Sequence, residues 1–388
     1  MLDNIITGRQ GTVRNNLAGL AAYRSFNPAP LDAVLPIEMS PERIRLLTEC
    51  SRKIGELAGM VQFVPNADMY LTMYVRKEAL LSSQIEGTQC TFDDVLDPSG
   101  ANASEDIADV VHYVEASRLA LKLMGTMPLS LRLLRRVHSV LIGEGRGADK
   151  TPGEVRTSQN WIGPGGSTIQ TAPYVPPNVQ DMHVALSELD KFINSDIDID
   201  PLVKASLVHY QFETIHPFLD GNGRLGRLLI TLSLMNDGVF DVPLFYPSYR
   251  LKLNRREYYA RLTAVRERGA YEEWVSFFCE SMLESARDAT ESLRALVATH
   301  VDASQVIGER FKRGRAQALS LLEFLEAHPI VKVNDVRDGL GISRTSASNL
   351  VSEFTALGIL SPCDERRRYR TYAYERYLEI LRDGAAPL

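Results

Sequence analysis

The chain has 388 residues, of which 45% are hydrophobic and 24% charged, and its formal net charge is −6. This length predicts two or three folding units, and the composition is that of an ordinary folded protein rather than a disordered or fibrous one. The longest nearly unbroken apolar stretch, Leu228 to Met235, is too short to span a bilayer. The residues from Met1 to Gln10 contain no basic region followed by an apolar segment, which argues against a secretory signal.

The four cysteines are widely scattered and follow neither metal-ligand spacing nor the pattern of a dense disulfide framework. We therefore expect a reducing, cytoplasmic location. The negative net charge argues against a protein whose whole surface binds nucleic acid.

In chain order, residues 1–37 have a mixed pattern, and we assign no element to this N-terminal extension. Helical patterning begins at Ser40, a candidate N-cap followed by Pro41 at the first helical position. A second helix is expected to end before Gly87, a candidate C-cap. Apolar residues recur at helical spacing along the following segments. The predicted helices after the first cover 68–85, 107–124, 130–142, 181–193, 202–215 and 224–236, with more helices to about residue 300.

The segment from Gly143 to Pro177 differs from its surroundings because it contains seven glycines and five prolines. A loop this long is uncommon in a compact domain unless it is used, so we expect a functional loop or a short hairpin. The last part of the chain predicts helices at 316–327, 333–340 and 343–357. Two strands within 359–374, around an arginine-rich tip, are expected to follow.

The most informative segment runs from His216 to Arg227 and reads HPFLDGNGRLGR. Gly221 and Gly223 have no Cβ, so their backbone N–H groups can approach a ligand closely. The helix that follows adds the positive end of its dipole, which makes a ready anion site. Arg224 and Arg227 lie three residues apart and project from one face of that helix, where guanidinium groups suit bidentate contacts to phosphate.

Two further side chains complete the chemistry of this loop. Asp220 can hold a divalent cation that bridges phosphate oxygens. His216 can take a proton from an incoming hydroxyl. A phosphate cradle, a metal ligand and a base within one loop predict phosphoryl or nucleotidyl transfer.

This segment resembles the Fic family signature, histidine-x-phenylalanine-x-acid-glycine-asparagine-glycine-arginine-x-x-arginine. All eight specified positions match, namely His216, Phe218, Asp220, Gly221, Asn222, Gly223, Arg224 and Arg227. Eight matching residues in register make a specific motif. The resemblance implies a protein adenylyltransferase that transfers AMP from ATP, with Mg²⁺, to a Ser, Thr or Tyr hydroxyl of a target protein.

The same resemblance implies a role for each matched residue. His216 would be the general base, Asp220 would bind magnesium, and Phe218 would anchor the loop in the core at the ATP site. Arg227 would reach the γ-phosphate of ATP. The α- and β-phosphates would be held by Gly221, Asn222, Gly223 and Arg224. The related Doc branch, which phosphorylates its target, has a different loop.

A second motif lies upstream, where Ser82, Glu86 and Gly87 match the Fic inhibitory pattern serine-x-x-x-glutamate-glycine. The resemblance implies that Glu86 lies at the ATP site, pairs with Arg227 and occupies the place of the γ-phosphate. Its position before the catalytic motif is that of family members whose inhibitory helix is N-terminal.

Two other stretches resemble substrate-binding parts of the family. Residues 152–156 and 159–163 resemble the flap, which holds the target segment by strand-like pairing. Ser248, Tyr249, Asn254, Tyr258 and Tyr259 resemble the residues on the adenine side. Asn254 is expected to hydrogen-bond the base and Tyr258 to pack on its face.

The C-terminal part resembles a winged helix-turn-helix, with 343–357 as recognition helix and an arginine cluster on the wing. The wing residues would be Arg366, Arg367, Arg368 and Arg370. Residues 311–388 carry 12 Lys and Arg against 10 Asp and Glu, a net of only +2. DNA binding needs many phosphate contacts, so docking of a protein, or dimerisation, is the favoured use.

We therefore expect a mainly α fold, with an unassigned extension at 1–37, an inhibitory-helix region at 38–100, a catalytic core with a small β-hairpin flap at 101–300 and a winged-helix domain at 311–388. The expected function is protein adenylylation held in check by Glu86, with self-modification and a homodimer among its properties and no membrane partner. Two alternatives are a DNA-binding regulator that uses the core as a nucleotide sensor, and an enzyme that also removes AMP from its target. The intact His216 and Asp220 argue against a mere sensor.

Overall fold

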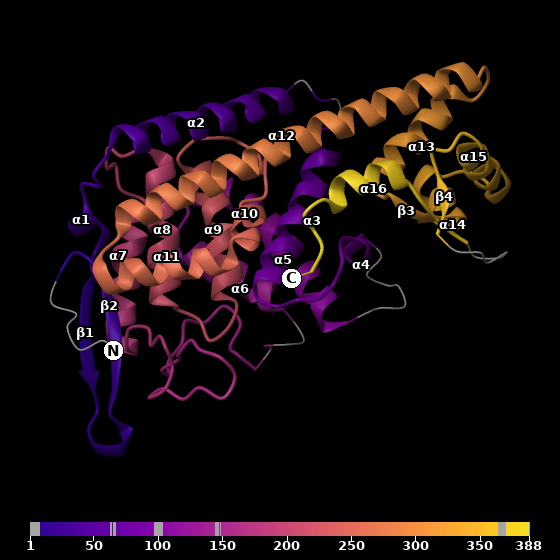
Figure 1. Cartoon of the computed structure of the whole chain (residues 1–388). Helices are drawn as coiled ribbons and strands as arrows, with labels where there is room; N and C mark the ends of the chain where they lie inside the picture. Colours follow the sequence, from indigo (N-terminus) through magenta and orange to yellow (C-terminus); the bar gives the residue numbers. More distant parts are fainter. Residues whose placement is uncertain are drawn as a thin grey trace.

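The computed structural model describes residues 8–62, 64, 67–96, 104–143, 147, 149–363 and 370–387. Within them the chain is mainly helical, with two small antiparallel sheets (Figure 1). The helices before the predicted loop are α1 (Leu31–Val34), α2 (Pro41–Val61), α3 (Ala67–Ile85), α4 (Phe92–Leu96), α5 (Glu105–Met124) and α6 (Leu131–Ile142). Those after it are α7 (Val179–Ile193), α8 (Pro201–Ile215), α9 (Asn222–Asn236), α10 (Ser248–Leu253), α11 (Arg255–Arg268) and α12 (Tyr271–Arg310).

Helices α8 and α9 form the centre of the main unit. Almost every residue of both is buried, which fits their lack of a polar face. The indole of Trp274, on α12, donates a hydrogen bond to the Ser206 carbonyl on α8 at 2.9 Å. The loop that joins α8 to α9 is therefore held between two rigid, fully packed elements, and this is where the predicted motif lies.

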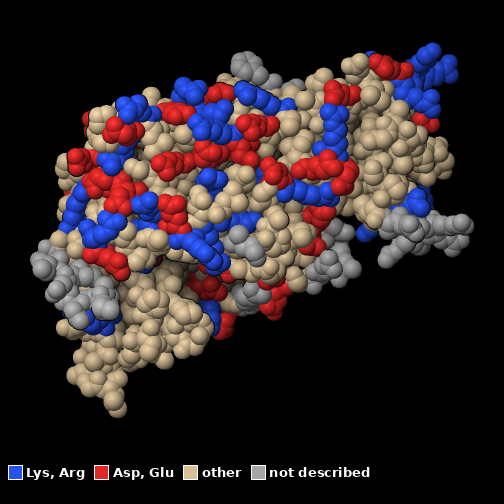
Figure 2. Space-filling model, viewed as in Figure 1, with Lys and Arg blue, Asp and Glu red and all other residues tan. Residues whose placement is uncertain are grey.

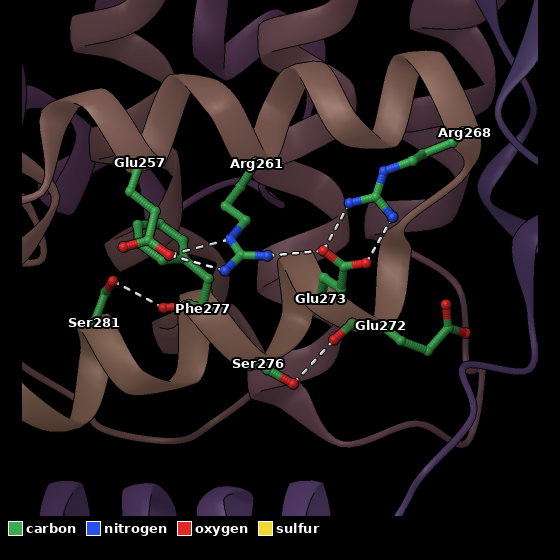
Figure 3. A network of polar contacts seen from close by, with 8 residues as sticks. All are labelled: Glu257, Arg261, Arg268, Glu272, Glu273, Ser276, Phe277 and Ser281. Atoms are coloured by element: carbon green, nitrogen blue, oxygen red, sulfur yellow. Dashed lines mark hydrogen bonds and ion pairs between the residues drawn. The ribbon is translucent and has the colours of Figure 1, made fainter.

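The long helix α12 runs along one side of the unit with α2 beside it (Figure 1). Ser40 caps α2 as predicted, since its hydroxyl accepts the N–H of Arg43. On the other flank of α12, Arg261 of α11 binds both Glu257 and Glu273 and ties α11 to α12 (Figure 3). This network joins the outer surfaces of α11 and α12.

The N-terminal extension, left unassigned from the sequence, contains a β-hairpin of β1 (Gly11–Asn16) and β2 (Tyr23–Pro28). The hairpin is fixed to α7 by Arg14, which pairs with Asp181 at 2.6 Å. The N–H of Phe26 donates to the carbonyl of Val175 at 3.0 Å, so the hairpin also adjoins the end of the predicted loop. These contacts come from parts of the chain far away in sequence, which is why the local pattern did not indicate strands.

Over residues 149–177, the glycine- and proline-rich segment is a loop across one end of the unit, with a single antiparallel bridge between Ile162 and Tyr174 among these described residues. Arg156, fully buried, organises it. Its guanidinium donates to the carbonyls of His216 at 3.1 Å and Ser158 at 3.2 Å, and to that of Pro177. The loop is thus tied directly to the residue that begins the motif.

The C-terminal part follows the predicted order of helices and strands. It comprises α13 (Arg315–Ala327), β3 (Ile330–Lys332), α14 (Val333–Leu340), α15 (Arg344–Ala356), β4 (Ser361–Pro362), β5 (Thr371–Ala373) and α16 (Glu375–Arg382), with sheet order β3-β5-β4. The sequence did not indicate β3 or α16. The predicted tip with Arg366, Arg367 and Arg368 lies outside the described residues, and the winged-helix assignment stays a prediction.

The end of the chain returns to the main unit. Arg382 pairs with Asp93 of α4 at 2.7 Å, and the amide of Gln84, on α3, donates to the Ala385 carbonyl at 3.0 Å. Lys252 donates to the Gly384 carbonyl at 3.0 Å. Among the described helices, none is long and apolar enough to cross a membrane.

Candidate active site

The predicted motif forms the turn between α8 and α9. His216 ends α8 in the left-handed conformation at φ 50°, and Gly221 precedes α9 with φ 72°. A Cβ at Gly221 would come within 2.5 Å of Ile142, so this position combines a positive φ with close packing that only glycine tolerates. Helix α9 begins at Asn222, two residues before the predicted start, and its first N–H groups have no carbonyl partner within the helix.

Two motif residues hold this turn together. The side chain of Asn222 accepts the N–H of Phe218 at 2.9 Å and donates to its carbonyl at 2.9 Å. Phe218 is fully buried and stacks on the ring of His138 with 3.8 Å between centroids. Asn222 therefore offers a phosphate only its backbone N–H, and Phe218 lies under the pocket as an anchor rather than in it.

His216 stands half-buried beside the pocket. Its Nδ1 lies 3.3 Å from the Glu213 carbonyl, which can only accept, so Nδ1 carries the proton and Nε2 has the free lone pair. Burial lowers the pKa of His216 to about 4, so the ring is neutral at pH 7. A neutral imidazole with an open Nε2 has the form that a general base requires.

These residues open onto a pocket of about 280 Å³ between the motif and the end of α3. Its lining includes Glu86, Thr88, Asp109, His216, Leu219, Asp220, Gly221, Asn222, Gly223 and Arg224. One oxygen of Asp220, Oδ1, accepts the Gly221 N–H at 2.6 Å. The described residues contain no group of three His, Cys, Asp or Glu that would enclose a metal by themselves. A single carboxylate beside phosphate oxygens is a common arrangement for magnesium, and Asp220 fits it.

Arg224 is nearly buried at the rim of this pocket. Its Nη1 lies 3.4 Å from a carboxylate oxygen of Asp109. The same Nη1 is buried without a hydrogen bond to any described residue. Because a buried N–H normally has an acceptor, this group suits an anionic oxygen in the pocket.

Arg227 and Glu86 are in contact beside the pocket, as the family resemblance implied. The guanidinium donates to a Glu86 carboxylate oxygen at 2.7 Å, and to the hydroxyl and carbonyl of Ser82 at 2.9 and 3.0 Å. The Arg227 side chain is 1% exposed and that of Glu86 43% exposed. Contact is close because Gly223 lacks a Cβ, which would come within 2.2 Å of the Glu86 oxygen.

The charges of this pair support each other. Burial by itself raises the pKa of Glu86, but the adjacent guanidinium groups of Arg227 and Arg224 outweigh it and the net pKa is lowered. For Arg227, burial alone lowers the pKa, but Glu86, together with Tyr258, Tyr259 and Glu213, more than reverses the change. Both side chains are therefore charged at neutral pH.

Two segments of the chain match models of known protein families. Residues 44–122 match the family model described as Fic/DOC family N-terminal, and residues 128–234 match the model described as Fic/DOC family. The second match contains the whole motif turn, and the first contains Ser82, Glu86 and Gly87. The chain contains a Fic/DOC family domain, preceded by a Fic/DOC family N-terminal domain.

Individual proteins agree with this Fic assignment. "Protein adenylyltransferase Fic" of Drosophila yakuba is 29% identical over 184 residues, which are 45% of this chain and 34% of that protein. The chain thus matches only about a third of the length of this curated relative. A Fic family protein from Desulfovibrio desulfuricans G20 has the same fold over 87% of this chain and 97% of its own, with TM-score 0.54 and 20% identity. A Fic domain-containing signaling protein from Bacteroides thetaiotaomicron covers 62% of this chain and 95% of its own, with TM-score 0.50 and 17% identity.

One prediction for the adenine side of the Fic pocket, the packing of Tyr258 on the base, is contradicted by the structure. Tyr258 is fully buried, and its hydroxyl lies 2.9 Å from Nε2 of His209, so its ring packs in the core and is closed to a base. Its neighbour Tyr259 is 38% exposed. The pKa of Tyr259 is raised to about 12, first by burial and then by the negative charge of Glu86. This side chain is therefore close enough to the pocket to interact with Glu86. Asn254 is half-buried between α10 and α11 and makes no side-chain cap.

A helical reading of α11 would have found this difference. Tyr258, Leu262 and Val265 are buried at spacings of four and three, which marks the inner face of a helix. Tyr259 is one residue away and so points elsewhere. Ser248, also expected near adenine, is buried and donates its N–H to Glu78 at 2.9 Å.

The sequence also failed to single out His138 of the Fic core. This histidine is fully buried on α6 and contacts the motif turn. A lone histidine among apolar residues gives no local signal of such a contact.

Proposed function

We propose that this chain is a protein adenylyltransferase, which transfers AMP from ATP to a Ser, Thr or Tyr hydroxyl of a target protein. The observation that carries the proposal is one pocket that combines neutral His216 with the N-terminus of α9, Arg224 and Asp220. The name of the Drosophila relatives supports the reaction class.

In the proposed reaction, the hydroxyl oxygen of the target attacks the α-phosphorus of ATP while its proton passes to Nε2 of His216. The bond between the α-phosphorus and the bridging oxygen breaks, and pyrophosphate leaves. The first N–H groups of α9 and the buried Nη1 of Arg224 stabilise the negative charge on the phosphate oxygens. Asp220 would hold Mg²⁺, which supplies charge neutralisation for the polyphosphate when bound.

Glu86 is proposed to inhibit this reaction. Its carboxylate accepts a hydrogen bond from the guanidinium of Arg227, which would otherwise bind the γ-phosphate. ATP bound without that contact would not present its α-phosphorus to the attacking hydroxyl. Ser82 supports the inhibited state because it holds two of the Arg227 donors in place.

The loop around Trp161 is proposed to bind the target. Residues 157–180 include no Asp, Glu, Lys or Arg. Figure 2 shows charged side chains crowded over α2, α11 and α12 and few on the end formed by this loop and the hairpin. Trp161 and Ile162 are 43% and 37% exposed there, so the surface suits an uncharged, extended segment of a protein.

The test is transfer of label from ATP. The full chain is incubated with ATP labelled either on the α- or on the γ-phosphate, with and without a cell lysate, and modified proteins are identified by mass spectrometry. We expect an AMP adduct that carries only the α-label, and its absence in His216→Ala. Label from the γ-phosphate on protein would mean phosphorylation and would refute the proposal.

A further inference from the structure

His138 lies on α6, outside the motif, and contacts two separate parts of the Fic core, the motif turn and the long loop. Its ring stacks on Phe218 at 3.8 Å and an interplanar angle of 11°. Its Nε2 lies 3.0 Å from the carbonyl oxygen of Asp220. Its Nδ1 lies 2.8 Å from the backbone nitrogen of Gly153, at the start of the long loop. A fully buried polar side chain with both nitrogens in use calls for a specific role.

The two contacts define the proton on this ring. The backbone N–H of Gly153 can only donate, so Nδ1 of His138 must be the acceptor. The carbonyl of Asp220 can only accept, so Nε2 carries the hydrogen and donates it. The neutral ring is therefore a bridge of fixed direction from the loop to the motif turn.

The Asp220 carbonyl belongs to the peptide group that joins Asp220 to Gly221. The oxygen of this peptide is held by His138, and its N–H donates to Oδ1 of Asp220 at 2.6 Å. If the peptide turned over, the N–H would leave the carboxylate and the oxygen would leave His138. Gly221, with φ 72°, gives the backbone this freedom, so the side-chain contact is what selects one orientation.

We propose that His138 is a positioning residue, which holds the Asp220–Gly221 peptide so that the Asp220 carboxylate is presented to a metal-bound nucleotide. The same ring ties the start of the target-binding loop at Gly153 to that peptide. The inference rests on the proposed function, because it assigns His138 to the binding of magnesium and ATP.

Two conservative variants separate the contacts. In His138→Gln the amide nitrogen reaches the position of Nε2 and keeps the donor to Asp220, but Gly153 loses its acceptor. In His138→Asn the amide oxygen reaches the position of Nδ1 and keeps the acceptor for Gly153, but the donor to Asp220 is lost. Both variants lose the ring that stacks on Phe218, and they differ from each other in size by only one methylene group.

The measurement is ATP binding to the full chain by calorimetry over a range of Mg²⁺ concentrations, without a target protein. We expect His138→Asn to need about 10- to 100-fold more Mg²⁺ for half-maximal binding, as is usual when support of a metal ligand is lost. His138→Gln should stay close to wild type. Equal losses in the two variants, or no loss in either, would overturn the proposal.

Amide hydrogen exchange gives a second measurement that does not depend on binding. His138→Asn should accelerate exchange at Gly221 but not at Gly153, and His138→Gln should do the reverse. If His138→Asn does not fold, His138→Gln is sufficient for the test. In His138→Gln, exchange accelerated as much at Gly221 as at Gly153 would contradict the proposal. Wild-type protein that binds no ATP at any Mg²⁺ concentration would instead refute the proposed function.

Discussion

Replacement of Glu86 by glycine is the most informative change, because it removes one partner of the pair with Arg227. Arg227 would keep its two bonds to Ser82 and lose one charge-assisted hydrogen bond. Such a bond contributes about 1.5–3 kcal/mol, and solvent at the 43% exposed Glu86 side chain screens part of this. We expect the free energy of unfolding without ligand to fall by about 1–2 kcal/mol.

The same free energy opposes ATP in the wild type, because the γ-phosphate must displace Glu86 from Arg227. Its removal should raise the rate of self-modification by a factor of about 5–30, the equivalent of 1–2 kcal/mol. The variant should therefore be less stable without ATP, more active with it, and stabilised more strongly by ATP in a thermal melt. A variant that is both less stable and more active distinguishes inhibition from a merely structural ion pair.

The assay compares pyrophosphate release and self-modification at saturating ATP and Mg²⁺. Glu86→Gln is the matched control, since it keeps the size of the side chain and removes the charge, and it should give an intermediate rate. Glu86→Gly combined with Arg227→Ala should lose the gain, because the γ-phosphate then has no guanidinium. If Glu86→Gly is no faster than wild type, self-inhibition through Arg227 is wrong.

Three further outcomes are expected. His216→Ala should lower AMP transfer by about 10²–10⁴-fold and leave ATP binding by calorimetry nearly unchanged; wild-type transfer would remove His216 from the mechanism. Because burial lowers the pKa of His216 to about 4, and loss of Glu86, which raises this pKa, lowers it further, kcat/KM of Glu86→Gly should be level from neutral pH to about pH 5 and fall only at about pH 4 or below, whereas an acid limb near pH 6.5 would contradict a buried base. Gly223→Ala should push Glu86 away from Arg227, since the new Cβ would lie 2.2 Å from its oxygen, and partly activate self-modification. Its control, Gly59→Ala, meets nothing within 4 Å on α2 and should not change the rate.

Much of the fold was predictable because a helix is indicated by the periodic spacing of apolar residues that are close in sequence. The predicted helices of the main unit correspond to α2, α3, α5, α6, α7, α8 and α9, with ends that differ by a few residues. The motif turn was equally local, since Gly221 and Gly223 allow the backbone geometry and Arg224 and Arg227 share a helix face. Periodicity and backbone freedom depend on neighbours in sequence, so they can be seen without the fold.

The remaining features depend on residues that are distant in the chain. The hairpin of β1 and β2 exists because Arg14 and Phe26 find partners near residues 175–181, which a local pattern cannot report. Tyr258 and Tyr259 differ because α12 covers one face of α11 and leaves the other open.

The contact between Glu86 and Arg227 and the contacts of His138 show most clearly which features the sequence indicates and which depend on the tertiary structure. The sequence alone placed a glutamate before a glycine at the end of α3 and two arginines on α9, and by resemblance it paired Glu86 with Arg227. Only the tertiary structure brings these residues, 141 positions apart, to 2.7 Å. It alone sets His138 against Asp220, 82 positions away. Side-chain chemistry can be read from residue types, but direction and distance between distant segments follow from packing of the whole core.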